Sequence, residues 1–302
     1  MANEEWSSEE ARAFAPGHVT GLFAPVTPGN DVRAWGSVGL GIVLNKGARV
    51  RARARRGSGS SLQVHSPTLS CGLSITEKAV RGLWDSAPYP GSIDVEIVHE
   101  LPVARGLGMS AAGTLAASLA VAKLLHLPES AAVVAAHTAE VEGHGGLGGV
   151  PAILGGGVEV RRTAGIPPFG KVERTPFGMP VLVACLPQPL ESPPLLGDAH
   201  FLAQVTRAAQ DLLEAVPLPP VPTDSLMQLS SRFTERLSLA TPPLKEGLDL
   251  LRHRGIVAAQ AMLGNTLFTI GYEPEVTREL EAKGFTLYQL RGGSSGAALV
   301  TG

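Results

Sequence analysis

A glycine-rich loop that opens onto a helix holds the residues best suited to chemistry. Residues 101–113 read LPVARGLGMSAAG, and an alanine- and leucine-rich helix is expected to follow without a break to about residue 125. Gly106 and Gly108 allow close approach of the backbone, and Ser110 can present a hydroxyl in the first helical turn. Backbone N–H groups and the helix dipole at such a start attract anions. Spacing alone supports a phosphate site and a plain serine-capped turn equally well.

A second candidate lies on the helix expected to begin near Ser130 and to end at Gly143. Glu140 is an acidic side chain on this alanine-rich helix, where it could be a solvated or capping group. Its apolar neighbours make a solvated helix face costly. His137 lies one turn earlier on the same face, a position at which most histidines are structural. We therefore take Glu140 as the candidate site residue of this helix.

Two other glycine patterns are weaker. Gly143, Gly145 and Gly148 satisfy G-x-G-x-x-G, but they follow a helix, whereas a dinucleotide-binding fold needs a strand before the glycines and a helix after them. Residues 165–172 nearly match a P-loop, but Val172 stands where a metal-binding hydroxyl is required. We interpret neither pattern as a nucleotide site.

The remaining pattern predicts the elements that must position these residues. Residues 1–13 show no pattern, and the proline-rich segment 217–223 is interpreted as a loop. The expected strands are 14–23, broken by a turn, a hairpin or meander over 37–64, and 92–98, 157–162, 181–186, 266–271 and 285–290. The further helices expected are 73–84, 198–215, 224–240, 243–253, 255–264 and 274–283. Repeated turns between 167 and 180 place a domain boundary near residue 178.

A strand within residues 37–64 carries arginine at every second position. Its alternation puts Arg49, Arg51, Arg53 and Arg55 on one face. A solvated sheet face explains this pattern, and so does an anion-attracting wall beside a phosphate or carboxylate site. No aromatic residues interleave with the arginines, so the pattern does not indicate a nucleic-acid patch.

Composition argues against several classes of protein. The 302 residues carry 25 basic and 27 acidic side chains, a formal net charge of −2, which argues against electrostatically driven nucleic-acid binding. Two cysteines, Cys71 and Cys185, allow neither a disulfide framework nor a four-cysteine zinc site. The acidic start MANEEWSSEEARAF has no apolar run, and the apolar residues 113–127 are too few to span a bilayer. These features predict a cytoplasmic protein without nucleic-acid or membrane partners.

Three segments together resemble the GHMP superfamily of small-molecule kinases, named for its galactose, homoserine, mevalonate and phosphomevalonate members. They are FAPGHVTGLF at 14–23, LPVARGLGMSAAG at 101–113 and AHTAEVEGHGGLGGV at 136–150. Met109 in the loop and the segments 36–41 and 261–266 are most similar to the archaeal pantoate kinases within that superfamily. The resemblance covers residues 14 to about 268.

The resemblance implies a two-lobed α+β fold, with lobes at 14–178 and 179–302 and the nucleotide between them. It also implies ATP and Mg²⁺, and the phosphorylation of (R)-pantoate to 4-phosphopantoate on a route to coenzyme A. The alternatives are another small hydroxy acid or polyol as the acceptor, and a catalytically impaired ATP-binding relative. Ser110 and Glu140 would be the catalytic residues and the Mg²⁺ ligands. The phosphates would be held by Gly106, Leu107, Gly108, Met109, Ser110, Ala111 and Ala112.

One position departs from the family pattern. Where these kinases read Gly-Leu-Gly-Asp-Val, residues 146–150 read Gly-Leu-Gly-Gly-Val, so Gly149 replaces the aspartate placed to accept the substrate's proton. No aspartate occurs between Asp94 and Asp198, so a shift of one or two residues cannot supply it. We prefer transfer without a dedicated base, because a loose transition state keeps the proton until late. His144 as a substitute base and impaired catalysis stay open as alternatives.

In the kinases that this chain resembles, the segment around His18 and Thr20 faces the acceptor. Read alone, both could be turn-stabilising polar residues. An acid substrate also needs a cation, which Arg105 beside the loop or an arginine of the strand at 49–55 could supply. The substrate-binding candidates are therefore His18, Thr20, Arg105 and His144. A homodimer is a further expectation from the family.

Overall fold

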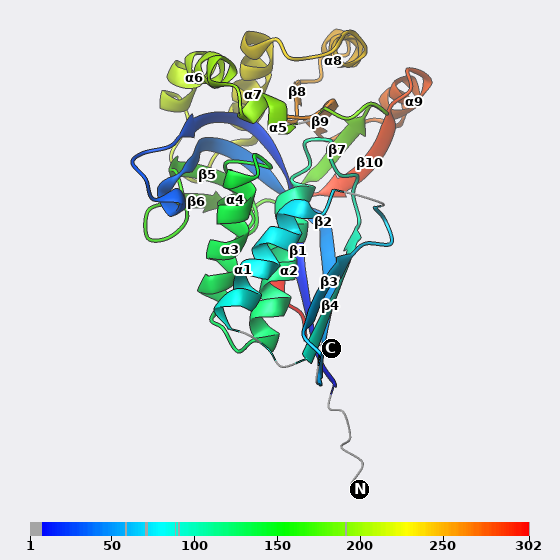
Figure 1. Cartoon of the computed structure of the whole chain (residues 1–302). Coiled ribbons are helices and arrows are strands. Elements are labelled where there is room, and N and C mark those ends of the chain that lie inside the picture. The colour runs from blue at the N-terminus through cyan, green and yellow to red at the C-terminus, as the bar shows by residue number, and fades with distance from the viewer. Residues whose placement is uncertain are drawn as a thin grey trace, which may run out of the picture.

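The strands of the computed structural model, which describes residues 8–57, 59–69, 72–87, 89, 91–190 and 192–301, form two sheets (Figure 1). The larger sheet has the order β11-β1-β2-β4-β3, to which β5 adds by pairing with β2 and β6 by pairing with β5. The smaller sheet has the order β10-β7-β9-β8. The larger sheet contains β1 (Ser8–Val26), β2 (Gly36–Arg56), β3 (Ser61–His65), β4 (Gly91–His99), β5 (Val158–Thr163), β6 (Lys171–Thr175) and β11 (Ala298–Leu299). The smaller contains β7 (Pro180–Cys185), β8 (Ala258–Gln260), β9 (Thr266–Ile270) and β10 (Thr286–Arg291).

Helices pack against both sheets, as the α+β fold class predicts. Beside the larger sheet lie α1 (Ser74–Ser86), α2 (Met109–Leu124), α3 (Glu129–Glu142) and α4 (Gly149–Ala152). The second half of the chain adds α5 (Ser192–Leu196), α6 (Ala199–Glu214), α7 (Thr223–Leu237), α8 (Pro242–His253) and α9 (Pro274–Ala282). Helix α2 is buried along nearly its whole length, because its small side chains let α1, α3 and the sheet approach it closely. Among the described residues, none of the helices has the length and apolarity that crossing a bilayer requires.

Strands β1 and β2 are longer than predicted. Residues 8–13, which show no pattern in the sequence, form the first part of β1 and pair with the far end of β2. The backbone hydrogen bonds of this pairing do not depend on side-chain alternation, and the alanines at 11 and 13 are buried. The second half of β1 curves beneath α6 and α7, so one strand contacts helices from both halves of the chain (Figure 1).

Three further predictions are wrong. Segment 61–65 is not the partner of a hairpin, because β3 pairs in parallel with β4. Residues 255–264 are not a helix, since the alanine-rich segment forms β8 and pairs with β9. Backbone pairing inside a buried sheet overrides the helix preference of alanine there. Strand β6 lies where the sequence suggested only turns.

The expected boundary near residue 178 falls between the two sheets. Strand β6 ends at Thr175 and β7 begins at Pro180. The chain then returns to the larger sheet at its far end, where Ala298 and Leu299 of β11 pair with β1. We keep the division into two lobes as a proposal, with β11 as a late addition to the first.

Candidate active site

The glycine-rich loop forms a left-handed turn into α2. Gly106 has a φ of 76°, and Gly108, the residue that caps the helix, has a φ of 65°. A Cβ at Gly106 would lie 2.7 Å from the carbonyl oxygen of Ala261, and one at Gly108 would lie 3.1 Å from Cβ of His18. Glycine is therefore required at both positions, by conformation and by space. Because Gly108 has no side chain with which to cap the helix, the first-turn N–H groups are left for another acceptor.

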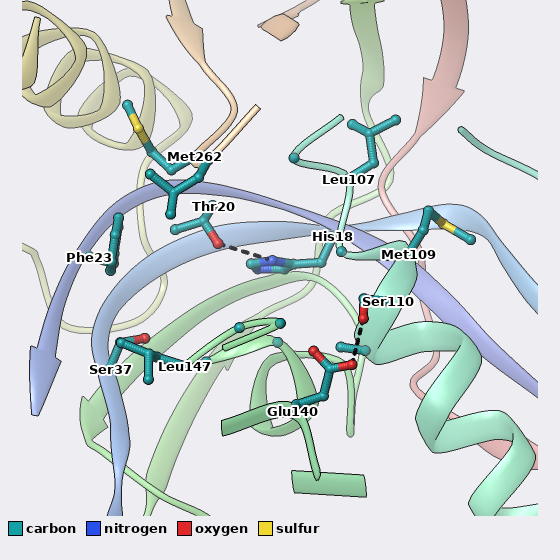
Figure 2. A pocket seen from close by; sticks show the side chains of 18 of the residues that line it. His18, Thr20, Phe23, Ser37, Leu107, Met109, Ser110, Glu140, Leu147 and Met262 are labelled. Carbon is teal, nitrogen blue, oxygen red and sulfur yellow. Dashed lines mark hydrogen bonds between the residues drawn. The ribbon is translucent and has the colours of Figure 1, made fainter. Parts of the chain in front are cut away.

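Ser110 and Glu140 meet at the start of α2 (Figure 2). The Ser110 hydroxyl donates to Oε1 of Glu140 at 2.6 Å, and the Thr114 hydroxyl donates to the same oxygen at 3.2 Å. Glu140 is 2% exposed, and its Oε2 has no hydrogen-bond partner in the described part of the chain. Burial raises the pKa of this carboxyl to about 7, against the opposing effect of the two hydroxyl donors.

This pair fits a hard divalent cation. A carboxylate oxygen without a partner and an adjacent hydroxyl are ligands that Mg²⁺ accepts, and Mg²⁺ in phosphate sites commonly takes one or two protein carboxylates. No group of three or more histidines, cysteines, aspartates or glutamates gathers as a metal site within the described ranges. A cation bound to Glu140 would therefore complete its shell with phosphate and water oxygens.

Ser110 and Glu140 line a cavity, and β1 forms the wall of this cavity that faces them. His18 and Thr20 are two residues apart and both line the cavity that Ser110 and Glu140 line (Figure 2). The β1–β2 pairing changes register between Pro16 and His18 and again between Thr20 and Leu22. Such irregularities bend a strand and re-aim its side chains. The part of β1 that carries His18 and Thr20 is therefore an irregular stretch of strand between two register changes.

Backbone hydrogen bonds hold this wall at both ends. The N–H of His18 donates to the carbonyl of Leu107 in the glycine-rich loop at 2.9 Å. The carbonyl of Thr20 accepts from the N–H of Met262 at 3.0 Å, in the segment after β8. These two hydrogen bonds thus connect the wall both to the glycine-rich loop and to the second half of the chain.

A buried ion cluster, which no sequence pattern predicted, lies behind the wall. Nε2 of His18 lies 2.9 Å from Oε1 of Glu159, and Arg161 donates to the same oxygen. These three side chains are at most 2% exposed. A Cβ at Gly148 would lie 2.8 Å from Nε of Arg161, which has no partner in the part of the chain that the structure describes. The available signal was the alternation of charged residues with valines in the strand expected at 157–162.

Other predicted site residues lie elsewhere. Arg105 donates to the carbonyl of Pro187, and its side chain does not line the cavity. His144 is exposed, with a φ of 53°, and does not line the cavity either. Ala112 is buried inside α2. The arginines of β2 lie away from the cavity, and three are in ion pairs: Arg49 with Glu100, Arg51 with Glu96 and Arg53 with Glu10.

Gly149 begins α4 at the floor of the cavity. A Cβ built on it would lie 2.7 Å from Cβ of Ala111, closer than two such atoms can approach. The backbone at Gly149 therefore packs against the first turn of α2 at a distance that only glycine allows. The cavity is closed from the second half of the chain by Leu196, Met262 and Leu263.

Comparison with known proteins agrees with this geometry. Residues 74–157 match the family described as the GHMP kinases N terminal domain. The pantoate kinase of Methanospirillum hungatei is 30% identical over 286 residues, covering 93% of this chain and 94% of the relative. The pantoate kinase of Thermococcus kodakarensis is 30% identical over 277 residues, covering 88% and 89%.

A solved structure described as a phosphotransferase related to the CoA biosynthesis pathway has the same fold. It matches with a TM-score of 0.82 and 25% identity, covering 97% of this chain and 99% of its own. The likeness in sequence and structure thus extends over almost the whole length of both proteins. The chain belongs to the pantoate kinase family of the GHMP kinases.

Proposed function

We propose that this protein is a pantoate kinase, which transfers the γ-phosphoryl group of ATP to the hydroxymethyl oxygen of (R)-pantoate and forms 4-phosphopantoate. The observation that carries the proposal is the Ser110–Glu140 pair at the open start of α2, facing His18 and Thr20 across one cavity. The names of the relatives support pantoate as the acceptor. We further propose that the reaction serves coenzyme A biosynthesis and takes place in the cytoplasm. That the protein forms a homodimer stays a prediction.

The loop end of the cavity is the proposed phosphate site. First-turn N–H groups of α2 and the loop backbone from Gly106 to Ala111 bind the phosphate oxygens. Glu140 and Ser110 hold Mg²⁺, which supplies positive charge that neutralises the phosphates during transfer. The nucleotide extends from this loop between the two halves of the chain.

The β1 end of the cavity is the proposed acceptor site. Thr20 offers a hydroxyl there, and Ser37 lines the same cavity. Arg161 supplies a cation for the pantoate carboxylate: it does not line the cavity itself, but it lies behind Ser37 and Gly148, which do, and its Nε has no hydrogen-bond partner among the described residues. A guanidinium suits a carboxylate because its N–H groups form a planar fork. Arg161 thus takes the role of the cation for the acid substrate, which the sequence had suggested for Arg105 or for an arginine of the strand at 49–55.

Phosphoryl transfer at this site depends mainly on alignment and charge neutralisation. The loop, Glu140 and the β1 wall are each fixed by the hydrogen bonds described above, so the reacting groups meet in a preset geometry. This rigidity partly offsets the absence of an aspartate at Gly149.

The test is the formation of ADP and 4-phosphopantoate by purified protein with Mg²⁺ and ATP, with and without (R)-pantoate. We expect pantoate-dependent turnover in the wild type and its loss in Ser110→Ala. Turnover with another hydroxy acid or polyol, and not with pantoate, would instead support a different acceptor. Undiminished ATP binding without transfer to any acceptor would show a nucleotide-binding relative without kinase activity.

A further inference from the structure

The hydrogen-bond partners of His18 determine where its ring proton lies. Oε1 of Glu159 accepts from Arg161, and Nε2 of His18 lies 2.9 Å from the same oxygen. A carboxylate oxygen that pairs with a guanidinium is an acceptor, so Nε2 of His18 must be the donor. In the neutral ring, Nδ1 then carries a lone pair and no proton.

Thr20 continues this chain toward the cavity. Its Oγ1 lies 3.3 Å from Nδ1 of His18, and the two atoms are joined in Figure 2. Because Nδ1 can only accept, the Thr20 hydroxyl must donate its one proton to the ring. Both lone pairs of Oγ1 are then free to accept from a hydroxyl in the cavity that Thr20 lines.

We propose that Thr20, His18 and Glu159 form a proton relay that takes the proton of the acceptor hydroxyl, in place of the aspartate absent at Gly149. Thr20 is the catalytic residue, since it touches the acceptor. His18 acts through Thr20, and Glu159 and Arg161 fix the ring. This inference rests on the proposed function, because it assigns the base of that reaction.

The proposed step conserves every atom and charge. As the acceptor oxygen forms its bond to the γ-phosphorus, the bond from that phosphorus to the β–γ bridging oxygen breaks, and its electron pair leaves with ADP. The acceptor proton passes to Oγ1 of Thr20, while the proton of Thr20 passes to Nδ1 of His18. In the return step Nδ1 of His18 gives its proton back to Oγ1 of Thr20, and Oγ1 releases the excess proton to water in the cavity, which restores the starting state.

The surroundings of His18 keep its ring neutral before the step. Burial lowers the pKa of His18, and the hydrogen bond to Glu159 opposes that shift. The charges that act on it are Glu159, Arg161 and Arg174, and Glu140 faces the same cavity from α3. A neutral ring can accept a proton, and the carboxylate of Glu159 then stabilises the positive ring. Desolvation confines the competing protonated state to acidic pH.

Thr20→Val and Thr20→Ser are a matched pair that tests the relay. Valine keeps the shape of threonine without the hydroxyl, whereas serine keeps the hydroxyl. Pantoate-dependent kcat should fall about 100-fold or more in Thr20→Val, the usual effect of losing general-base help, with little change in KM for ATP. Thr20→Ser should retain most of the activity.

The pH profile separates the relay from a structural role. In the wild type and in Thr20→Ser, kcat should fall toward acid as His18 becomes protonated, below its ordinary range around pH 6.5. Thr20→Val should lack this limb, while any limb from Glu140 should remain in all three proteins. If Thr20→Val retains the wild-type kcat and acid limb on pantoate, the relay is overturned and the kinase function stands.

A ring-nitrogen NMR measurement keeps the two proposals distinguishable. In wild-type protein labelled with ¹⁵N-histidine, the His18 signal is the one that moves in Thr20→Val. A neutral ring with its proton on Nε2 supports the relay, and a proton on Nδ1 overturns it, whatever the activity. If the wild type binds ATP but does not phosphorylate pantoate, the kinase proposal fails, and this spectrum still decides the polarity of the Thr20–His18–Glu159 chain.

Discussion

Glu140 combines nearly complete burial with a carboxylate oxygen that no described residue satisfies. Removing a carboxylate from water disfavours its charged form, so the free protein holds this group partly protonated near neutral pH. A bound cation reverses this preference, because it favours the carboxylate. The same residue therefore lowers stability in the free protein at alkaline pH and provides a ligand in the proposed complex.

Glu140→Gln should abolish a pH dependence of stability. The native pKa, about 7, lies above the ordinary value of 4.5, so the contribution of Glu140 is complete below pH 4.5 and is lost as the pH rises through 7. The loss amounts to about 3 kcal/mol. We would measure the free energy of unfolding by urea at pH 5 and pH 8 without metal or nucleotide. The stability of the variant relative to the wild type should be higher at pH 8 than at pH 5. An equal difference at both pH values would contradict the raised pKa.

Gly149→Ala should destabilise the protein by about 1–3 kcal/mol, because its new Cβ would lie against Cβ of Ala111. Ala111→Gly in the same chain should recover most of that loss, which a double-mutant cycle on the free energy of unfolding measures. Additive effects of the two substitutions would show that the two side chains do not meet.

Gly149→Asp adds a carboxylate at the same crowded position. We expect the kcat of this variant to stay at or below that of the wild type.

At the scale of elements, β1 joins the glycine-rich loop to the helices of the second half. Its residues near the register changes contact both: His18 binds the loop through its N–H, and Thr20 binds the segment at Met262 through its carbonyl. Gly21 lies against Ser230 of α7, so closely that a Cβ would overlap the serine hydroxyl. Close packing of β1 on α7 therefore depends on the absence of a side chain.

Gly21→Ala should lower the free energy of unfolding by about 1–3 kcal/mol through this overlap. Gly82→Ala is the matched control, because Gly82 lies within α1 and a Cβ there has no neighbour within 4 Å. That control should raise stability by roughly 0.5–1 kcal/mol, the helix preference of alanine over glycine. Chemical denaturation of both variants checks the pair; a neutral Gly21→Ala would show that β1 and α7 separate easily.

At the scale of the whole molecule, the proposed site depends on both halves of the chain. The glycine-rich loop, Glu140 and β1 come from the first half, and Leu196, Met262 and Leu263 close the cavity from the second. A ligand that contacts both halves stabilises the two halves together, because it binds the folded chain and not the unfolded one.

Mg²⁺-ATP and pantoate should each raise Tm, and at one hundred times its dissociation constant a ligand adds about 2.7 kcal/mol. In Ser110→Ala the increment from Mg²⁺-ATP should shrink while that from pantoate persists, since Ser110 lies at the end of the cavity proposed to bind the phosphates. Differential scanning fluorimetry with each ligand alone measures both increments. If Ser110→Ala reduced the Tm increments from Mg²⁺-ATP and from pantoate equally, Ser110 would not belong to a phosphate site distinct from the acceptor site.

The sequence by itself determined the features that depend on neighbouring residues. The loop glycines, the start of α2 and the positions of Ser110 and Glu140 follow from local spacing, since a helix turn and its preceding loop are short-range structures. Most helices and strands were predicted for the same reason. The absence of an aspartate at Gly149 was also legible from the sequence alone.

Only the tertiary structure decided which distant residues meet. His18 and Glu159 are 141 positions apart, and strand pairing through β2 brings them together; no local pattern encodes that pairing. Pairing with β2 extended β1 to Ser8, and pairing with β9 turned the middle of the expected helix at 255–264 into β8. The folded chain also gave Arg105 and three arginines of β2 other partners, and it left Arg161 behind residues that line the cavity. A long-range contact forms when it satisfies buried polar groups in the whole fold, and that balance is not written in any one segment.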